Sequence, residues 1–426
     1  MGIKIFKNKV AVLGILICLA FINLALFGFN PAPPSGDSVD YNAYAKNLAL
    51  GNGYTDDGSS FSIYREPGYP FFISLIYRTF GIENFKAVKI IQTLFLALTA
   101  FIVYLIFNLY DRKKVGLIAA FLTAAIPSYG FYASHLNPEL PFAFLLILLL
   151  YLLLRICKND ENLLFYAITG SVFAGAALTR SFIVFLPFLI GSGLRIILHK
   201  KIKSVIIFYL AFLLLILGWA SYVHHKTGVW AITQGRVELH LYARAVRSTL
   251  SYKKNVAYLY SWVKRSALGG EEDKNFTNYE IWALIKKYGD LTRHDYPAER
   301  IKAESIATIL HNPGHYLFGN VIEWVKLVFI EHLYPPISLL LNRYVRAIFY
   351  ALLYGLFLFG SIQFLKNRDQ KLRPIFWLAS IFLLYNWIIM SFFDAVPRFN
   401  TPYLVFYLLI GVAGLANLKP FIKHEQ

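Results

Sequence analysis

The chain has 426 residues, of which 57% are hydrophobic and only 15% are charged, and its formal net charge is +18 at pH 7. This composition excludes an ordinary soluble globular protein and indicates a polytopic membrane protein. A basic membrane protein is expected to meet anionic membrane lipids, and its charge gives no support to nucleic-acid binding.

Apolar runs long enough to cross a bilayer recur from one end of the chain to the other. They lie near residues 10–29, 86–109, 115–133, 139–156, 163–179, 181–198, 203–223, 346–365, 374–392 and 400–418. We therefore predict an all-α protein with about ten transmembrane helices. The first run is interpreted as a retained helix, with a cleaved signal peptide as the competing interpretation.

Lysine and arginine gather in every second short loop between these runs. The basic positions are Lys4, Lys7, Lys9, Arg112, Lys113, Lys114, Arg155, Lys158, Lys200, Lys201, Lys203, Lys366, Arg368, Lys371, Arg373, Lys419 and Lys423. Because cytoplasmic loops carry the excess of positive charge, both termini are predicted to be cytoplasmic. The short loops at 134–138 and 393–399, the polar stretch 36–70 and the long segment 224–345 are then on the outer side.

The polar stretch 36–70 concentrates acidic, aromatic and turn residues. Asp37 stands four residues before Tyr41, where an N-cap or first-turn acid of a helix is expected. Residues 64–70 read Tyr-Arg-Glu-Pro-Gly-Tyr-Pro, and the two prolines and the glycine predict a fixed turn beside Arg65. Taken alone, Asp37 fits a capped surface helix as well as a functional site.

Isolated charges also stand in the other short outer turns. Glu139 follows His135 at the start of a predicted helix, Arg180 lies where two apolar runs almost touch, and Arg398 stands between two prolines. Each has a structural alternative, because a carboxylate is favoured at a helix N-terminus and a surface arginine can snorkel to water.

The motifs of the first outer loop carry a family resemblance. An Asp four residues before a Tyr is followed by A-x-x-L-x-x-G-x-G-Y at 45–54 and R-x-P-G-Y-P at 65–70. This pattern resembles the first extracytoplasmic loop of the polyprenyl-phosphate-sugar-dependent membrane glycosyltransferases, which include protein mannosyltransferases and the aminoarabinose transferase of lipid A. The resemblance extends along the chain in topology, whereas its motifs are dense only here. It implies a GT-C-like helical bundle with extracytoplasmic helical loops.

The resemblance implies catalytic roles for two carboxylates. Asp37 would be the general base, and Glu139 would orient Asp37, the acceptor or a metal ion. If a divalent metal cation takes part, its candidate ligands are Asp37, Glu139 and His135; no other cofactor is expected.

Three arginines are the candidates for binding the donor phosphate, namely Arg65, Arg180 and Arg398. Arg180 belongs to a Leu-Thr-Arg element, and Arg398 to an element that resembles P-R-Y-x-x-P of the family. Phe399 replaces the usual Tyr there, so any hydrogen bond of that hydroxyl is lost in this chain. The remaining candidates for substrate binding are Tyr41 and Tyr69.

The expected donor is a sugar carried by polyprenyl phosphate. The sequence contains no Walker loop, no H-E-x-x-H, no clustered cysteines and no G-x-S-x-G. No stretch is left for a soluble cytoplasmic domain that would bind a nucleotide sugar, so the donor is expected to be carried by a lipid. Phosphate is a stable leaving group, so one carboxylate that takes the proton of an acceptor hydroxyl suffices, and attack opposite the leaving group inverts the anomeric centre. The acceptor remains open between a lipid, a glycan and a protein.

Two other classes of protein compete with an enzyme. A polytopic transporter or flippase of a lipid-linked sugar would share the composition, but ion-coupled carriers commonly place ionisable residues at mid-membrane. A structural subunit of a cell-envelope complex would leave the loop motifs without a purpose. The clustering of the charged candidates at one membrane face favours the enzyme.

We predict three parts of the chain. Residues 1–223 form an N-terminal transmembrane module with a catalytic first outer loop at 30–85, residues 224–345 form an extracytoplasmic, mainly helical segment, and residues 346–426 form C-terminal transmembrane helices. Within the long segment, the aromatic run Val321–Leu333 is predicted to lie at the interface and to cover the site.

Overall fold

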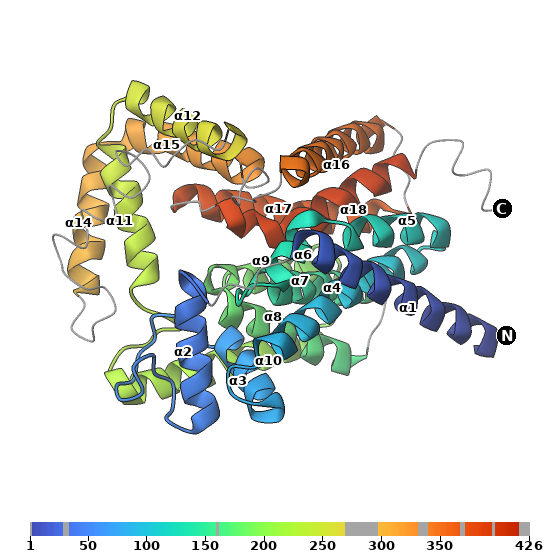
Figure 1. Cartoon of the computed structure of the whole chain (residues 1–426), viewed down its shortest axis with the longest axis horizontal. Helices are drawn as coiled ribbons and strands as arrows, with labels where there is room; N and C mark the ends of the chain where they lie inside the picture. The colour runs from blue at the N-terminus through green and yellow to red at the C-terminus, as the bar shows by residue number, and fades with distance from the viewer. Residues whose placement is uncertain are drawn as a thin grey trace.

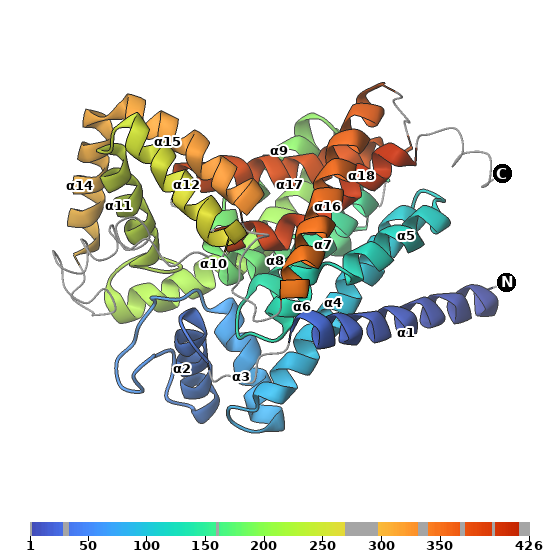
Figure 2. The ribbon, with the colours of Figure 1, turned by 45° about the horizontal axis from the view of Figure 1, so that its top comes forward.

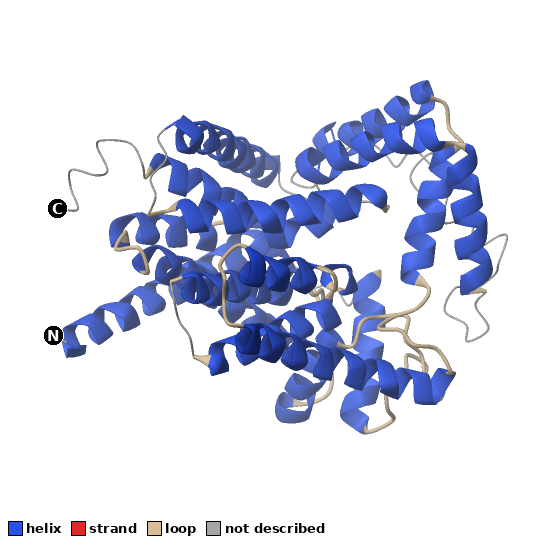
Figure 3. Cartoon of the chain, turned by 180° about the vertical axis from the view of Figure 1, so that it is seen from behind, coloured by secondary structure: helices blue, strands red, loops and turns tan. Residues whose placement is uncertain are grey.

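The structure of the protein is a computed structural model. It describes residues 2–28, 34–158, 162–268, 297–330, 340–366, 371–393 and 397–416. Within these ranges the ordered elements are helices and there is no β-strand, which confirms the predicted all-α fold class (Figure 3).

The helices follow one another closely along the chain. The first half contains α1 (Gly2–Phe27), α2 (Asp37–Leu50), α3 (Gly68–Phe80), α4 (Phe85–Asn108), α5 (Lys113–Ala124), α6 (Pro127–Ala133), α7 (Glu139–Cys157), α8 (Leu163–Thr179), η1 (Ser181–Ile183), α9 (Leu186–Ile196) and α10 (Ile202–Thr227). The second half contains α11 (Arg236–Ser248), α12 (Tyr252–Leu268), α14 (Ala298–His311), α15 (Pro313–Val325), the π-helical turn η2 (Lys326–Ile330), α16 (Leu340–Lys366), α17 (Arg373–Phe392), η4 (Pro397–Tyr403) and α18 (Leu404–Leu415).

Seven helical stretches among the described residues are long and apolar enough to span a membrane. They are Lys9–Phe27, Phe85–Asn108, Glu139–Cys157, Ile202–Thr227, Val345–Lys366, Arg373–Phe392 and Arg398–Leu415. An eighth is obtained if α5 and α6, which meet at a bend of 52°, form one broken span. The fifth and sixth predicted spans correspond to the shorter apolar helices Leu163–Thr179 and Ser181–Ile196. The polytopic membrane fold is thus confirmed, whereas the number of ten spans is not.

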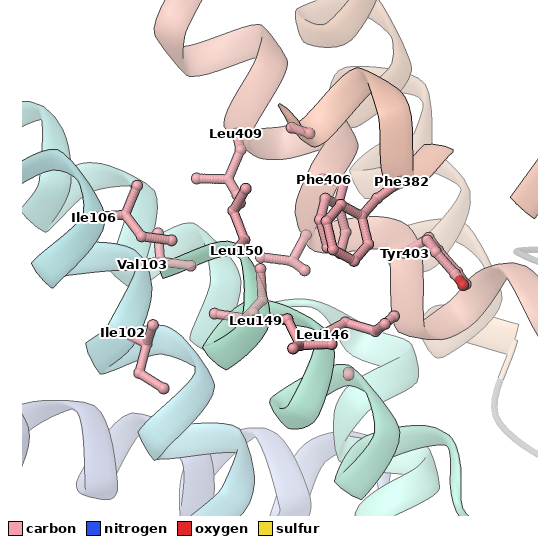
Figure 4. Close-up of a cluster of buried hydrophobic side chains, with 14 of the residues drawn as sticks. Ile102, Val103, Ile106, Leu146, Leu149, Leu150, Phe382, Tyr403, Phe406 and Leu409 are labelled. Carbon is pink, nitrogen blue, oxygen red and sulfur yellow. The ribbon is translucent and has the colours of Figure 1, made fainter. Parts of the chain in front are cut away.

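The bundle is built around α7 and α18. In the apolar window of α18, 89% of the residues are buried, and in that of α7 67% are buried. Figure 4 shows how side chains of α4, α7, α17 and α18 fill the space between these helices. By contrast, only 17% of the window of α1 and 22% of that of α16 are buried, so these two helices lie at the periphery.

Small residues permit the closest helix crossing. A Cβ added at Gly414 of α18 would lie 1.8 Å from the carbonyl oxygen of Gly360 in α16, so both positions require glycine. Close backbone approach of this kind is a common way for membrane helices to pack.

Helices α11, α12, α14 and α15 form an arm beside the bundle (Figures 1 and 2). Inside the arm, the buried carboxylate of Glu323 contacts Arg247 at 2.8 Å and Lys326 at 2.7 Å. At its base, Thr233 Oγ1 donates to the carbonyl oxygen of Ile63 at 2.8 Å. The arm is therefore anchored to the first outer loop that carries the predicted site.

Candidate active site

Helix α2 presents its acidic residues at its first turn. It begins at Asp37 behind Gly36, which has a φ of 55°, and Asp37 and Asp40 both lie in the first turn. Acidic side chains are favoured there because the helix dipole is positive at its N-terminus. The prediction that Asp37 is a first-turn acid is confirmed.

The loop after α2 folds back so that Arg65 returns to these acids. Tyr54 donates its hydroxyl hydrogen to the carbonyl oxygen of Arg65 at 2.8 Å, and the hydroxyls of Tyr44 and Ser62 lie 2.5 Å apart. The Arg65 side chain is only 2% exposed. Its guanidinium lies 4.8 Å from the ring centroid of Tyr41, which adds a cation–π contact.

Gly68 brings this loop against the end of α8. A Cβ at Gly68 would lie 2.6 Å from Thr179 Oγ1 and 2.9 Å from the carbonyl carbon and oxygen of Leu178. Glu66 then accepts a hydrogen bond from Ser181 Oγ at 3.0 Å. The predicted turn is confined to residues 64–67, because α3 begins at Gly68, and it places Glu66 directly beside Arg180.

The predicted carboxylates and arginines meet in one network. Arg65 Nη2 donates to Asp37 Oδ1 at 2.6 Å, and Arg398 donates to the other oxygen of Asp37. Arg180 Nη2 donates to Glu139 Oε1 at 2.5 Å, and Arg398 Nε lies 3.7 Å from the same oxygen. All five residues therefore converge, although 361 residues separate Asp37 from Arg398 along the chain.

The network contains an acid that the sequence reasoning missed. Asp40 Oδ2 accepts from Arg65 Nε at 2.9 Å and also from Arg65 Nη2. Asp40 lies three residues after Asp37, and this spacing puts both side chains on one face of α2. The spacing of Asp37 and Asp40 in the sequence could therefore have identified Asp40 as a member of the site. With Asp40 included, three guanidinium groups face three carboxylates, so the network is neutral overall.

Asp37 is held in its ionised form. Burial alone raises the pKa of this carboxyl, but the charges of Arg398 and Arg65 outweigh burial and hold the pKa of Asp37 well below its usual range. A carboxylate with such a low pKa and with both oxygens engaged is a weak proton acceptor. It becomes a stronger base when one guanidinium moves away.

The two predicted tyrosines differ in what their hydroxyls contact. The Tyr69 hydroxyl donates to Gln92 Oε1 at 2.7 Å, and Gln92 Nε2 donates to the carbonyl oxygens of Ala133 and His135. The Tyr41 hydroxyl is buried and has no hydrogen-bond partner among the described residues. The ring of Tyr69 packs edge-on against that of Tyr41 at 5.1 Å. Tyr69 is therefore held in place by hydrogen bonds, whereas the buried Tyr41 hydroxyl has none among the described residues.

The three candidate metal ligands do not form a metal site in the described structure. His135 Nδ1 lies 2.8 Å from the carbonyl oxygen of Phe131, and burial lowers the pKa of His135. Both oxygens of Asp37 and one of Glu139 already accept from arginines. Within the described ranges no group of three or more His, Cys, Asp or Glu side chains is arranged to hold a metal. In this arrangement both candidate carboxylates are paired with guanidinium groups, and Glu139 Oε2 is buried without a hydrogen-bond partner among the described residues.

A cavity of about 300 Å³ opens on the other side of Arg180. Glu66, Arg180 and Ser181 contribute polar groups to it, and most of its other lining side chains are apolar. They come from residues 182–185, the loop 231–233, α11, the C-terminal end of α17 and η4. The second oxygen of Glu66, Oε2, is buried without a hydrogen-bond partner in the part of the chain that the structure describes. The network thus adjoins a space that can hold a small polar group against apolar walls.

Comparison with known proteins agrees with this architecture. A family model for dolichyl-phosphate-mannose-protein mannosyltransferase matches residues 65–222, a little over a third of the chain. No curated protein matches the sequence significantly. Among solved structures, the apo form of the Archaeoglobus fulgidus oligosaccharyltransferase is similar, with a TM-score of 0.51 and 14% identity over 95% of this chain.

The alignment covers 50% of the oligosaccharyltransferase, so the present chain spans about half the length of that protein. At this level of identity the likeness shows a shared fold. Together with the family match, it supports the assignment of the chain as a membrane glycosyltransferase of the GT-C type.

Proposed function

We propose that the protein is an inverting glycosyltransferase that moves a sugar from a polyprenyl-phosphate donor to an acceptor hydroxyl at the extracytoplasmic membrane face. Asp37 is the general base. The observation that carries this proposal is the convergence of Asp37 and Glu139 with Arg65, Arg180 and Arg398 in one network. The acceptor is a lipid, glycan or protein hydroxyl.

The arrangement suits a reaction with a charged leaving group. A departing phosphate gains negative charge as the glycosidic bond breaks, and planar guanidinium groups stabilise such charge through paired hydrogen bonds. The phosphate needs no protonating acid, so a single base on the opposite face of the sugar completes the displacement. The acceptor proton passes to Asp37, and the bonding electrons leave with the phosphate.

Donor binding would also activate the base. In the network Arg398 and Arg65 both contact Asp37. A phosphate that draws Arg398 away frees one oxygen of Asp37 and raises the pKa of its carboxyl toward its ordinary value. The base then becomes effective only when the donor is in place, which limits unproductive chemistry. No step of this proposal involves a metal ion.

The test is transfer of labelled sugar from a polyprenyl-phosphate donor by the purified full-length chain in lipid nanodiscs. Asp37→Asn keeps the size of the side chain and removes the base, so we expect transfer to fall by about 10²- to 10⁴-fold. Asp57→Asn is the matched control, since Asp57 lies in the same loop, accepts bonds from Ser59 and Ser60, and is outside the network.

Three results would overturn the proposal in different ways. Wild-type transfer by a correctly inserted Asp37→Asn variant would remove Asp37 as base. Retained anomeric configuration in the product, determined by NMR, would exclude direct inversion. Movement of the lipid-linked sugar across the bilayer of proteoliposomes without its consumption would instead favour the flippase.

A further inference from the structure

Arg346 is a buried cation near the N-terminal end of the peripheral helix α16. Only 3% of the residue is exposed. Its Nε and Nη2 atoms are enclosed and have no hydrogen-bond partner in the described part of the chain. An arginine that snorkels would bring these nitrogens to water. Arg346 instead keeps them inside, where a charged group without a partner is strongly unfavourable.

No acidic side chain of the described residues contacts Arg346. Its guanidinium lies 5.7 Å from the ring centroid of Phe27 in α1 and 5.6 Å from that of Phe131 in α6. The ionisable groups that act on it within the described structure are Tyr132, Tyr350 and His135, and none is a carboxylate. Arg65 and Arg180 are equally buried, but each contacts a carboxylate. An anion is the kind of partner that would offset this buried positive charge.

The position of Arg346 connects it with both the membrane and the network. Helices α1 and α16 are the least buried of the spanning helices, and Figure 2 shows the first turns of α16 near the end of α1 and α6. Tyr132 lies within electrostatic range of both Arg346 and Arg398. An anion held by Arg346 would thus lie where α1, α6 and α16 meet, with Tyr132 near both arginines.

Accepting the proposed function, we propose that Arg346 binds the phosphate of the polyprenyl-linked donor and delivers it to Arg398. The network of Asp37, Asp40 and Glu139 with their three arginines is neutral, so it attracts a phosphate only weakly before it rearranges. Arg346 supplies the cation that the network lacks. A lipid phosphate fits this position because its apolar tail remains in the bilayer while the headgroup reaches between α1, α6 and α16.

The proposal is tested by direct binding to the full-length chain in phosphatidylcholine nanodiscs. The probes are polyprenyl phosphate, polyprenol and inorganic phosphate. We expect Arg346→Gln to weaken binding of polyprenyl phosphate by about 10- to 100-fold, the effect of losing hydrogen bonds to a charged group. Arg346→Lys should keep part of the affinity. Polyprenol, which lacks the phosphate, should bind all variants alike.

The matched control is Arg155→Gln. Arg155 also lies over a phenylalanine ring at the end of a spanning helix, with its guanidinium 4.7 Å from the Phe165 centroid, but at the C-terminal end of α7. Its replacement should leave binding of polyprenyl phosphate unchanged. If Arg346→Gln fails to fold, the affinity of Arg346→Lys for polyprenyl phosphate is compared with that of wild type. A lysine retains the charge but loses the planar pair of donors, so this affinity should be lower than that of wild type.

The outcomes separate this inference from the proposed function. Equal binding of polyprenyl phosphate by wild type, Arg346→Gln and Arg346→Lys would overturn the role of Arg346 even if sugar transfer is intact. Inorganic phosphate that binds through Arg346 as tightly as the lipid would overturn the lipid assignment. Arg346-dependent lipid binding without sugar transfer would leave this inference standing and remove the proposed function. In active enzyme, Arg346→Gln should raise the donor KM with little change in kcat.

Discussion

Gly68→Ala tests whether the close contact between the first outer loop and α8 creates the site. An alanine Cβ would come within 2.6 Å of Thr179 Oγ1 and within 2.9 Å of the carbonyl carbon and oxygen of Leu178. The hydroxyl of Thr179 can rotate, but the backbone of Leu178 cannot. The start of α3 must therefore move away from the end of α8, and Arg65 and Glu66 move with it.

The size of the effect follows from two opposing contributions. Replacing glycine by alanine in a helix gains up to about 1 kcal/mol of stability from the unfolded state. Overpacking against a rigid neighbour costs about 1–3 kcal/mol. We expect net destabilisation of the variant and, because a displacement of about 1 Å at a reacting centre costs about 10²-fold in rate, a comparable loss of sugar transfer.

The control is Gly175→Ala in α8, where an added Cβ has no atom within 4 Å. This variant should be as stable as wild type or more stable, and should transfer sugar at the wild-type rate. Combining Gly68→Ala with Thr179→Ala should restore only part of the activity, because the Leu178 carbonyl remains in place. Thermal unfolding and sugar transfer are measured on the same preparations. If Gly68→Ala and Gly175→Ala behave alike, the contact does not position the site.

Four further predictions concern the same region. Tyr41→Phe should lower transfer without lowering stability, because the hydroxyl has no hydrogen-bond partner among the described residues to lose. A stability loss in thermal unfolding would argue against a substrate contact. The pKa of Asp37 is lower in the folded state than in the unfolded chain, where it is about 3.9, so the ionised carboxylate stabilises the fold above that pH and this contribution is lost as the pH falls. In acid unfolding, the free energy of unfolding of wild type should therefore fall toward that of Asp37→Asn. A chelator such as EDTA should leave transfer unchanged, and restoration of lost activity by a divalent cation would refute the metal-free site. In a variant without native cysteines, Ser59→Cys should react with an impermeant thiol reagent on intact cells and Lys113→Cys should not; the reverse pattern would invert the predicted topology.

Part of the run Val321–Leu333, which is predicted to cover the site, packs beside Arg398. Leu327, in η2, packs against Met390 and Phe399 beside Arg398, while residues 331–333 of the predicted run lie outside the described residues. The covering role stays a prediction. It is checked by the ratio of donor hydrolysis to transfer after Leu327→Ala, which should rise if this contact helps to exclude water.

Local sequence determined the helices and several of the site positions. Apolar runs without charged residues must form helices in a bilayer, because every backbone polar group has to be paired within the segment. The acids Asp37 and Glu139 begin helices, where the dipole favours them, and Pro67 stands at the N-cap of α3, where it ends the bend that follows Arg65. These features depend on residues only a few positions apart in the chain, so they could be predicted from the sequence.

Tertiary structure alone decided which charges meet. The sequence offered Arg65, Arg180 and Arg398 as equivalent phosphate ligands, but each is paired with a carboxylate that other helices bring to it. The sequence contains no indication of a role for Arg346, which lies at the edge of an apolar run. Only its burial beside Phe27 and Phe131 distinguishes it from an arginine that snorkels to water. The physical reason is that hydrophobic patterning specifies how far a helix extends and which residues it exposes, whereas ion pairing depends on distances of a few ångströms set by how several helices pack together.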